Sequence, residues 1–275
     1  MRDYTKELPQ HTEKYVGEHD LFLEIYAGAN IRDDAGNRPP LLFVHGAYTG
    51  SWMWSKYIPH YVNAGWTCYV MNLRSHYRSR VLDMSVITFE DYLHDIREII
   101  AECGTPPVLI GFSMGGILGQ KLAETAELAG LVLIDSSLSK EVHELMPYQD
   151  IIPAVPGLIV PAPARKELAS IDESAEDIAF QRKYLSMESA KAFSAFSFHF
   201  GAAGISVDSR RIACPGLVIH AVNSEEDDRR GRVNAGYFAA EYKGLWNTTH
   251  TGLLVGQRYL EPAETVLNWL AAKLL

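Results

Sequence analysis

The residue with the clearest chemical potential is Ser113, which ends a run of apolar residues and is flanked by glycines. Gly111 and Gly115 stand two positions before and after it, which gives the spacing Gly-x-Ser-x-Gly. This spacing is typical of a tight turn from a strand into a helix, because the missing side chains let the helix begin directly over the strand end. Such a turn exposes the hydroxyl and directs the amides of the helix N-terminus at negative charge developing beside it. Ser113 is therefore the candidate nucleophile.

The candidate base is His250. A serine hydroxyl near its ordinary pKa is a poor nucleophile, so Ser113 needs a base within hydrogen-bond reach. His250 follows the last expected strand and precedes the last expected helix, where a loop at the carboxyl end of the sheet can carry it over Ser113. An imidazole also titrates near neutral pH, as a general base must. His76, His94 and His220 are interpreted as structural or surface residues.

Strands and helices alternate along the chain and would position these two residues. Short apolar runs such as 41–46 and 108–112 are typical of strands buried on both faces of a parallel sheet. The alternation predicts an α/β fold, with a mostly parallel central sheet and helices on both faces. Such sheets carry their ligand sites at the carboxyl ends of the strands. The expected strands are 20–27, 41–46, 67–71, 108–112, 131–134, 217–222 and 245–246, and the expected helices are 52–61, 89–102, 116–123, 229–241 and 262–274.

One region, residues 140–205, interrupts the alternation. It has no clear buried strand, but a proline-rich apolar run at 151–161 and then helical stretches that end in several phenylalanines. An insertion between two core strands, at the end of the sheet where the site is expected, is interpreted as a helical cap or lid. A plain packing subdomain is the alternative. The expected organisation is a core of residues 1–139 and 206–275 with the cap at 140–205.

Three motifs resemble those of the α/β-hydrolase fold family, and the resemblance covers nearly the whole chain. They are Leu-Leu-Phe-Val-His-Gly-Ala at 41–47, Gly-Phe-Ser-Met-Gly-Gly at 111–116 and Thr-His-Thr-Gly-Leu-Leu at 249–254. The order of nucleophile and histidine, and their places between core elements, agree with that family. The serine indicates the esterase- and lipase-like branch, and it argues against the related epoxide hydrolases and haloalkane dehalogenases, which use a carboxylate nucleophile.

The resemblance also implies an oxyanion hole. Its two donors would be the backbone amides of Met114, which follows the nucleophile, and Ala47, which follows His45-Gly46. Donors aimed at the tetrahedral oxyanion are needed for acyl transfer, and removing one typically lowers turnover about 10²- to 10³-fold. In the resembled family the histidine at the place of His45 is mainly structural, so it is not counted as a second base.

The acid that would orient His250 is where the sequence departs from the family pattern. After the penultimate strand the family usually has Gly-x-x-Asp, whereas residues 221–224 read Ala-Val-Asn-Ser. Glu225 is the carboxylate nearest to the expected place, and Asp227 lies further along. Asp135 ends the strand after the serine helix, where some relatives have their acid, although aspartate is also a common turn former there. The acid is therefore left open among these three residues.

A second departure follows the strand that ends at Met71. Many relatives have Arg-Gly-His-Gly in the next loop, whereas this chain has Arg-Ser-His-Tyr at 74–77. Ser75 and Tyr77 thus replace two glycines, which leaves the loop fewer residues that favour positive φ. The replacements bear on the conformation of this loop more than on the chemistry.

Composition and charge exclude several classes of protein. The chain has 275 residues, 47% of them hydrophobic, which is enough for one sizeable core. Its net charge of -9, without a basic run, argues against nucleic acid as a partner. No apolar leader and no stretch long enough to cross a bilayer are present, so we expect a cytoplasmic protein without membrane association. The three scattered cysteines fit neither a zinc site nor a disulfide framework, and no metal or cofactor is expected.

Together these residues predict a serine hydrolase that cleaves a small or medium uncharged carboxylic ester through an acyl-enzyme, with a lactone or thioester as variants. A hydroxynitrile lyase or a cofactor-free oxygenase would keep the same residues, so both remain alternatives within the fold. A non-catalytic ligand-binding protein on a hydrolase scaffold is the alternative from another class. The expected partner is a small-molecule substrate, and the sequence indicates no oligomeric state.

Overall fold

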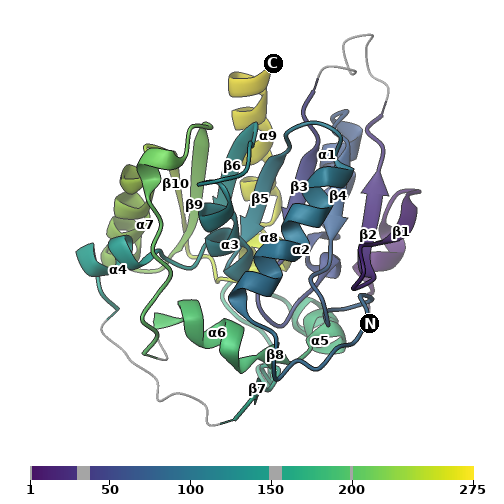
Figure 1. Cartoon of the computed structure of the whole chain (residues 1–275), viewed down its shortest axis with the longest axis horizontal. Helices are drawn as coiled ribbons and strands as arrows, with labels where there is room; N and C mark the ends of the chain where they lie inside the picture. The colour runs from purple at the N-terminus through teal and green to yellow at the C-terminus, as the bar shows by residue number, and fades with distance from the viewer. Residues whose placement is uncertain (1, 30–37, 149–156, 199–200) are drawn as a thin grey trace.

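A mostly parallel sheet forms the centre of the molecule (Figure 1). The computed structural model describes residues 2–29, 38–148, 157–198 and 201–275, so residues 151–156 of the proline-rich run lie outside the described ranges. Within these ranges, eight strands pair in the order β1-β2-β4-β3-β5-β6-β9-β10. Strand β2 is antiparallel to both of its neighbours, and the strands from β4 to β10 in this order are parallel. The bounds are β1 Thr12–Val16, β2 Leu21–Tyr26, β3 Leu41–Val44, β4 Cys68–Met71, β5 Val108–Phe112, β6 Gly130–Ile134, β9 Gly216–Val222 and β10 Glu241–Trp246.

The central strands are buried along their whole length, as their apolar sequences predict. Every residue of β3, β5 and β6 is buried. Side chains alternate between the two faces of a strand, so Leu41 and Phe43 enter one hydrophobic layer while Leu42 and Val44 enter the other. The core therefore lies on both sides of the sheet, and the strand ends are the places left for polar residues.

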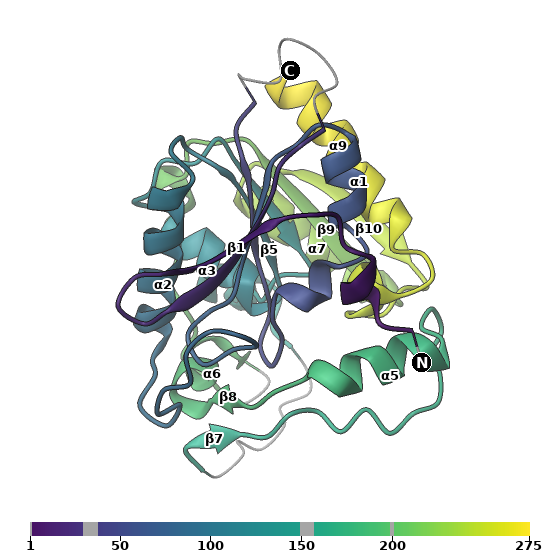
Figure 2. The ribbon, with the colours of Figure 1, turned by 90° about the vertical axis from the view of Figure 1, so that its right-hand side faces the viewer.

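Helices cover both faces of the sheet (Figure 2). Side chains of α1 and α9 belong to the hydrophobic layer on one face, and those of α2, α3 and α7 to the layer on the other. This arrangement confirms the predicted α/β fold. No helix in the described part of the chain is both long and apolar enough to cross a membrane. The bounds are α1 Ile58–Asn63, α2 Phe89–Glu102, α3 Met114–Leu122, α7 Glu225–Tyr237, α8 Gly252–Val255 and α9 Leu260–Leu274.

Two expected helices differ from the structure by more than two residues. The helix expected at 229–241 spans 225–237 instead, because Ser224 caps it by accepting a hydrogen bond from the amide of Asp227. Four acidic residues then fill the first turn, where the helix dipole favours negative charge. The helix expected at 52–61 is divided into a 3-10 helix, Ser51–Trp54, and α1. Strand β1 was not expected at all.

Residues 140–205, here called the connecting segment, join β6 to β9. In Figure 1 α5, α6 and the short strands β7 and β8 lie together below the central sheet, beyond one end of its strands. Strands β7 and β8 pair antiparallel, separately from the central sheet. The elements of the connecting segment are α4 Lys140–Leu145, β7 Ile159–Val160, α5 Ala175–Tyr184, β8 Glu188–Ser189 and α6 Ala190–Phe196.

Candidate active site

The turn that carries Ser113 is fixed by close backbone contacts. Ser113 has φ +53° and ψ −115° and lies between β5 and α3. A Cβ atom at Gly111 would lie 2.4 Å from the carbonyl oxygen of Gly115, and one at Gly115 would lie 2.3 Å from the carbonyl oxygen of Val44. Both glycines are therefore required for the helix to start over the strand, as their spacing predicts. A left-handed φ at a residue with a side chain costs roughly 1–3 kcal/mol and persists only where the surroundings enforce it.

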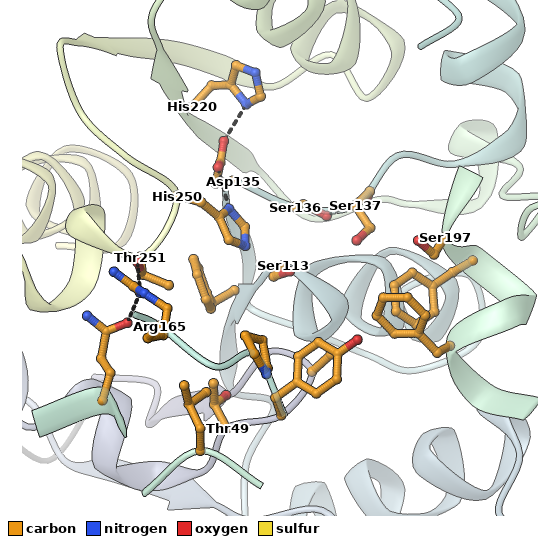
Figure 3. Close-up of a pocket in the computed structure, with 18 of the residues that line it drawn as sticks. Thr49, Ser113, Asp135, Ser136, Ser137, Arg165, Ser197, His220, His250 and Thr251 are labelled. Carbon is orange, nitrogen blue, oxygen red and sulfur yellow. Dashed lines mark hydrogen bonds and ion pairs between the residues drawn. The ribbon is translucent and has the colours of Figure 1, made fainter. Parts of the chain in front are cut away.

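His250 follows β10 and is oriented by Asp135. Its Nδ1 donates a hydrogen bond to Oδ2 of Asp135 over 2.5 Å, and its ring stacks on Phe112 with 4.5 Å between centroids. The side chain of His250 is 48% exposed, so it can exchange protons with a substrate in the cavity. Figure 3 shows the imidazole between Asp135 and Ser113.

Ser113 and His250 line the same cavity, but no hydrogen bond joins them in the described part of the chain. Catalytic hydrogen bonds are often long in the absence of substrate and tighten in the complex. With Nδ1 as the donor to Asp135, Nε2 is the imidazole nitrogen left to accept the proton of Ser113. The arrangement has the parts of a Ser-His-Asp triad in which the acid comes from the end of β6.

Asp135 is held at the end of β6 by three donors. Besides His250, the amide of Ala221 and Nδ1 of His220 both reach its Oδ1, over 3.0 and 2.7 Å. Burial alone would raise the pKa of Asp135, but the neighbouring His220 and His250 hold that pKa well below its ordinary value. Asp135 is therefore ionised at neutral pH, as an acid that orients an imidazolium must be.

The other two candidate acids lie elsewhere. Glu225 is the exposed first residue of α7. Asp227 accepts hydrogen bonds from the amide of Asn223 and from Arg230, at 3.1 and 3.4 Å. Neither is bonded to His250 in the ranges that the structure describes. Because Ser224 caps α7, the acidic run belongs to the helix rather than to a loop over the site, so the geometry favours Asp135 over Glu225 and Asp227.

His220 is a member of this cluster that sequence reasoning missed, since it was interpreted as structural or surface. It lies on β9, which pairs with β6 so that Ile219 is opposite Ile134. Burial would lower the pKa of His220, but the carboxylate of Asp135 raises it overall. The position of His220 near the end of an expected strand was one part of the signal, because adjacent parallel strands place their carboxyl ends together. The other part, that β9 is adjacent to β6, is not given by the sequence.

The two amides predicted as oxyanion donors flank Ser113. Ala47 lines the cavity, and its loop approaches so closely that a Cβ at Gly46 would lie 3.0 Å from Cβ of Ser113. Met114 is the first residue of α3. Neither amide is engaged in a hydrogen bond within the described residues, so both are available to a ligand. Their role as an oxyanion hole stays a prediction.

His45 is held as a structural residue beside this loop. It is fully buried, its Nδ1 lies 2.8 Å from the carbonyl oxygen of Gly46, and its Nε2 accepts the amide of Leu73 at 3.1 Å. Burial, together with the nearby His76, lowers the pKa of His45 to about 3. The ring is therefore neutral, and both of its nitrogens are occupied.

The loop after β4 adopts positive φ even without its glycines. Ser75 has φ +63° and Tyr77 has φ +48°. Their neighbours enforce this conformation: Arg74 is bonded to the buried Asp95 through its amide and its guanidinium, and His76 lies 3.1 Å from the buried Glu188. The loop thus keeps the backbone conformation that glycine favours, at the cost of local strain.

A cavity of about 500 Å³ opens beside Ser113. Apolar side chains from the connecting segment contribute to its lining, among them Leu185 and the α6 phenylalanines Phe193 and Phe196. The charged Arg165 also lines the cavity, but it is paired with Glu167 and Glu173. The lining residues are Ala47, Tyr48, Thr49, Phe112, Ser113, Asp135, Ser136, Ser137, Tyr148, Pro163, Arg165, Gln181, Leu185, Phe193, Phe196, Ser197, His220, His250 and Thr251.

One group of potential metal ligands occurs in the described residues, away from this cavity. His11, Glu13 and Glu24 place ligand atoms within 4.8 Å of one another on β1, β2 and the residues before them. Glu13 is already paired with Arg78, and Glu24 accepts a hydrogen bond from Tyr26. Because these carboxylates have protein partners, the group is explained without an ion.

Solved structures with the same fold match nearly the whole chain. They include a carboxylesterase of the thaumarchaeon Nitrososphaera gargenis (15% identity, 95% of this chain and 98% of that chain, TM-score 0.67). They also include a thermophilic esterase of Thermogutta terrifontis (19% identity, 97% of this chain and 100% of that chain, TM-score 0.65). A third is the enol-lactonase of Burkholderia xenovorans (16% identity, 94% of this chain and 100% of that chain, TM-score 0.66). At these identities the likeness establishes the fold alone.

A search of curated protein sequences returned no significant match. The family model described as the alpha/beta hydrolase family matches residues 41–263, which is most of the chain and includes the serine turn and His250. With the strand order, the serine turn and the histidine loop described above, this match shows that the chain belongs to the alpha/beta hydrolase family.

Proposed function

We propose that the protein is a serine hydrolase that cleaves a small or medium uncharged carboxylic ester. Oγ of Ser113 attacks the carbonyl carbon while Nε2 of His250 takes the hydroxyl proton. The amides of Ala47 and Met114 stabilise the tetrahedral oxyanion. The bond to the alcohol then breaks as His250 donates its proton to the leaving oxygen. Water repeats the sequence on the acyl-enzyme and releases the carboxylic acid.

The observation that supports the proposal best is the contact of 2.5 Å between Nδ1 of His250 and the carboxylate of Asp135, whose side chain is only 11% exposed. It fixes the tautomer in which Nε2 is the proton acceptor, and it stabilises the imidazolium that forms when Ser113 loses its proton. A histidine with a merely structural role would not need an ionised, multiply bonded partner beside a strained serine.

The preference for an uncharged ester follows from the cavity. Apolar residues such as Leu185, Phe193 and Phe196 contribute to its lining, which suits an acyl chain rather than a charged group. Arg165 is neutralised by Glu167 and Glu173 and offers no free cation to a substrate carboxylate. A lactone or a thioester places the same carbonyl before Ser113, so both belong to the proposed substrate class.

The proposal includes the cytoplasm as the compartment. Cys68, Cys103 and Cys214 are all free thiols, and burial raises the pKa of Cys68 and Cys103. Such cysteines pack as small apolar residues in a reducing environment.

The test is a panel of aryl esters of increasing acyl length, with γ-lactones, thioesters and cyanohydrins as further arms. We expect release of carboxylic acid from at least one ester class, and loss of that activity in Ser113→Ala and His250→Ala. Turnover of cyanohydrins alone would replace hydrolysis with lyase chemistry. Ester hydrolysis that survives Ser113→Ala, or tight ligand binding without any turnover, would contradict the proposal.

A further inference from the structure

The residues on both sides of His250 are bonded to two adjacent carboxylates of the connecting segment. Asp172 receives the amide and the hydroxyl of Thr249 at Oδ2 and Oδ1, over 3.0 and 2.7 Å. Glu173 accepts a hydrogen bond from the hydroxyl of Thr251 over 2.7 Å. Both residues are only 3% exposed. His250 therefore lies in the middle of a three-residue stretch whose two ends are fixed by another part of the chain.

The loop is built to admit Asp172. A Cβ atom at Gly252 would lie 2.1 Å from Oδ2 of Asp172, so the approach requires a glycine at this place. The backbone carbonyl of Asp172 also accepts the amide of Gln257 at 2.7 Å. Asp172 thus contacts the chain on both sides of α8. The bond from its carbonyl to Gln257 is separate from the bonds of its side chain to Thr249.

Glu173 is held in turn by its own neighbours. It accepts hydrogen bonds from Gln181 at 2.7 Å, from Ser170 at 2.9 Å and from Arg165 at 3.0 Å. Burial would raise the pKa of Glu173, but these donors, with Thr251, lower it overall. Arg165 also donates to the hydroxyl of Thr251 at 3.0 Å, and Figure 3 shows this contact beside the cavity. The carboxylate is therefore ionised and fixed in direction.

We propose that Asp172 and Glu173 are positioning residues for His250. The side chain of His250 has one strong bond, to Asp135, and is half exposed, so the path of its backbone decides where Nε2 meets the hydroxyl of Ser113. A misplacement of about 1 Å can lower a rate about 10²-fold.

The experiment compares Asp172→Asn, Glu173→Gln and Thr249→Val with wild type, with Glu176→Gln as control. Glu176 is an exposed carboxylate in the first turn of α5 and contacts neither threonine. We expect kcat on an activated ester to fall about 10- to 100-fold in Asp172→Asn, with KM changed less than about threefold. Thr249→Ser, which keeps the hydroxyl, should retain most of the wild-type kcat. The control should match wild type.

A second readout does not depend on turnover. The proton between Nδ1 of His250 and Asp135 gives a far-downfield NMR resonance when the hydrogen bond is short and shielded from exchange. We expect this resonance to broaden or disappear in Asp172→Asn and Thr249→Val while the thermal midpoint of unfolding stays near that of wild type. The kinetic measurement rests on the proposed function, whereas the NMR measurement does not. A wild-type protein that shows the resonance but hydrolyses no ester would therefore overturn the proposed function and not the positioning role.

The contrary results are equally distinct. A folded Asp172→Asn with wild-type kcat and an intact resonance would overturn the proposal. The proposal would also be overturned if activity fell only in proportion to the amount of folded protein, so that kcat per folded molecule stayed at the wild-type value. If Glu173→Gln does not fold, because Arg165 loses its buried partner, Thr251→Val removes the same contact from the side of the loop and takes its place in the comparison.

Discussion

The serine turn and the histidine loop reach the same cavity but are held in place by different means. The turn at Ser113 is fixed by backbone contacts, in which Gly111 and Gly115 leave room for neighbouring carbonyl groups. The loop at His250 is fixed by side chains, with Asp135 on the imidazole and Asp172 on the adjacent Thr249. The first device consists of backbone contacts within the turn and with the neighbouring strand β3, whereas the second consists of hydrogen bonds between side chains and the histidine loop. The two should therefore respond differently to substitution.

The largest expected effect is on activity, from the acid that orients the imidazole. Asp135→Asn should lower kcat/KM about 10³- to 10⁴-fold, because an amide cannot hold the tautomer that leaves Nε2 free. Glu225→Gln should stay within about threefold of wild type, since this exposed side chain lies in the first turn of α7. Steady-state assays on one activated ester measure both. An equal loss in Glu225→Gln would assign the acid to α7 instead.

The next effect is on stability, from the serine turn. Gly115→Ala should lower the free energy of unfolding by about 3 kcal/mol or more, because its Cβ meets the backbone oxygen of Val44 in a buried strand that cannot move aside. Gly236→Ala is the matched control: this glycine of α7 has no neighbour within 4 Å of a new Cβ, and alanine favours a helix by up to about 1 kcal/mol. Urea unfolding distinguishes the two variants, and equal stabilities would show that the turn can relax.

The same substitution in the histidine loop should act on rate more than on stability. In Gly252→Ala the new Cβ meets the carboxylate of Asp172, a side chain that can rotate away. We expect a loss of about 1 kcal/mol in unfolding free energy but a fall of about tenfold in kcat, because Thr249 loses its bonds to Asp172. Thermal unfolding and steady-state kinetics on the same sample give both values. A destabilisation as large as that of Gly115→Ala would remove the distinction between the two loops.

The smallest effect is a pH dependence of stability from the buried pair of His76 and Glu188, which joins the connecting segment to the loop after β4. Burial would lower the pKa of His76, but Glu188 raises it; burial would raise the pKa of Glu188, but His76 and Tyr92 lower it. The contribution of His76 is complete below its ordinary pKa of about 6.5 and is lost as pH rises through the raised value. That of Glu188 is complete above about 4.3 and is lost as pH falls through the lowered value.

The free energy of unfolding should therefore be greatest between these two limits and decline on both sides. Denaturant titrations over a pH series measure it, with His76→Gln as the comparison. The variant should be less stable than wild type below the raised pKa of His76 and should approach it above that pKa, so it should lose most of the decline on the alkaline side. An unchanged pH profile in His76→Gln would mean that this pair does not govern the dependence.

The fold was predictable from sequence because its signals are local. Apolar runs predicted β3, β5 and β6, and the span of α2 agrees with expectation, since Thr88 and Asp91 form a capping box at its start. The shifted α7 shows where such reasoning was incomplete. The helix was expected to start at residue 229, after the acidic run that follows Ser224, although the charges of that run stabilise a helix N-terminus.

The site residues also fall into two groups, those that the sequence could predict and those that it could not. Gly111, Ser113 and Gly115 could be recognised from their spacing, because the three residues that form the turn lie within five positions of the sequence. Asp135 could be named only as one of three acids, and His220 and Asp172 were not proposed at all. Their contacts depend on which strands are adjacent and on how the connecting segment packs, and neither property is written in a local pattern.

The central claim is that Ser113 is made nucleophilic by His250. Its most direct test is a fluorophosphonate probe followed by mass spectrometry of the labelled chain. The account predicts one probe molecule per chain, on Ser113, with labelling slowed strongly in His250→Ala and in Asp135→Asn. Three results would contradict it: a folded protein that is not labelled, labelling at a residue other than Ser113, or labelling of Ser113 at the wild-type rate in His250→Ala.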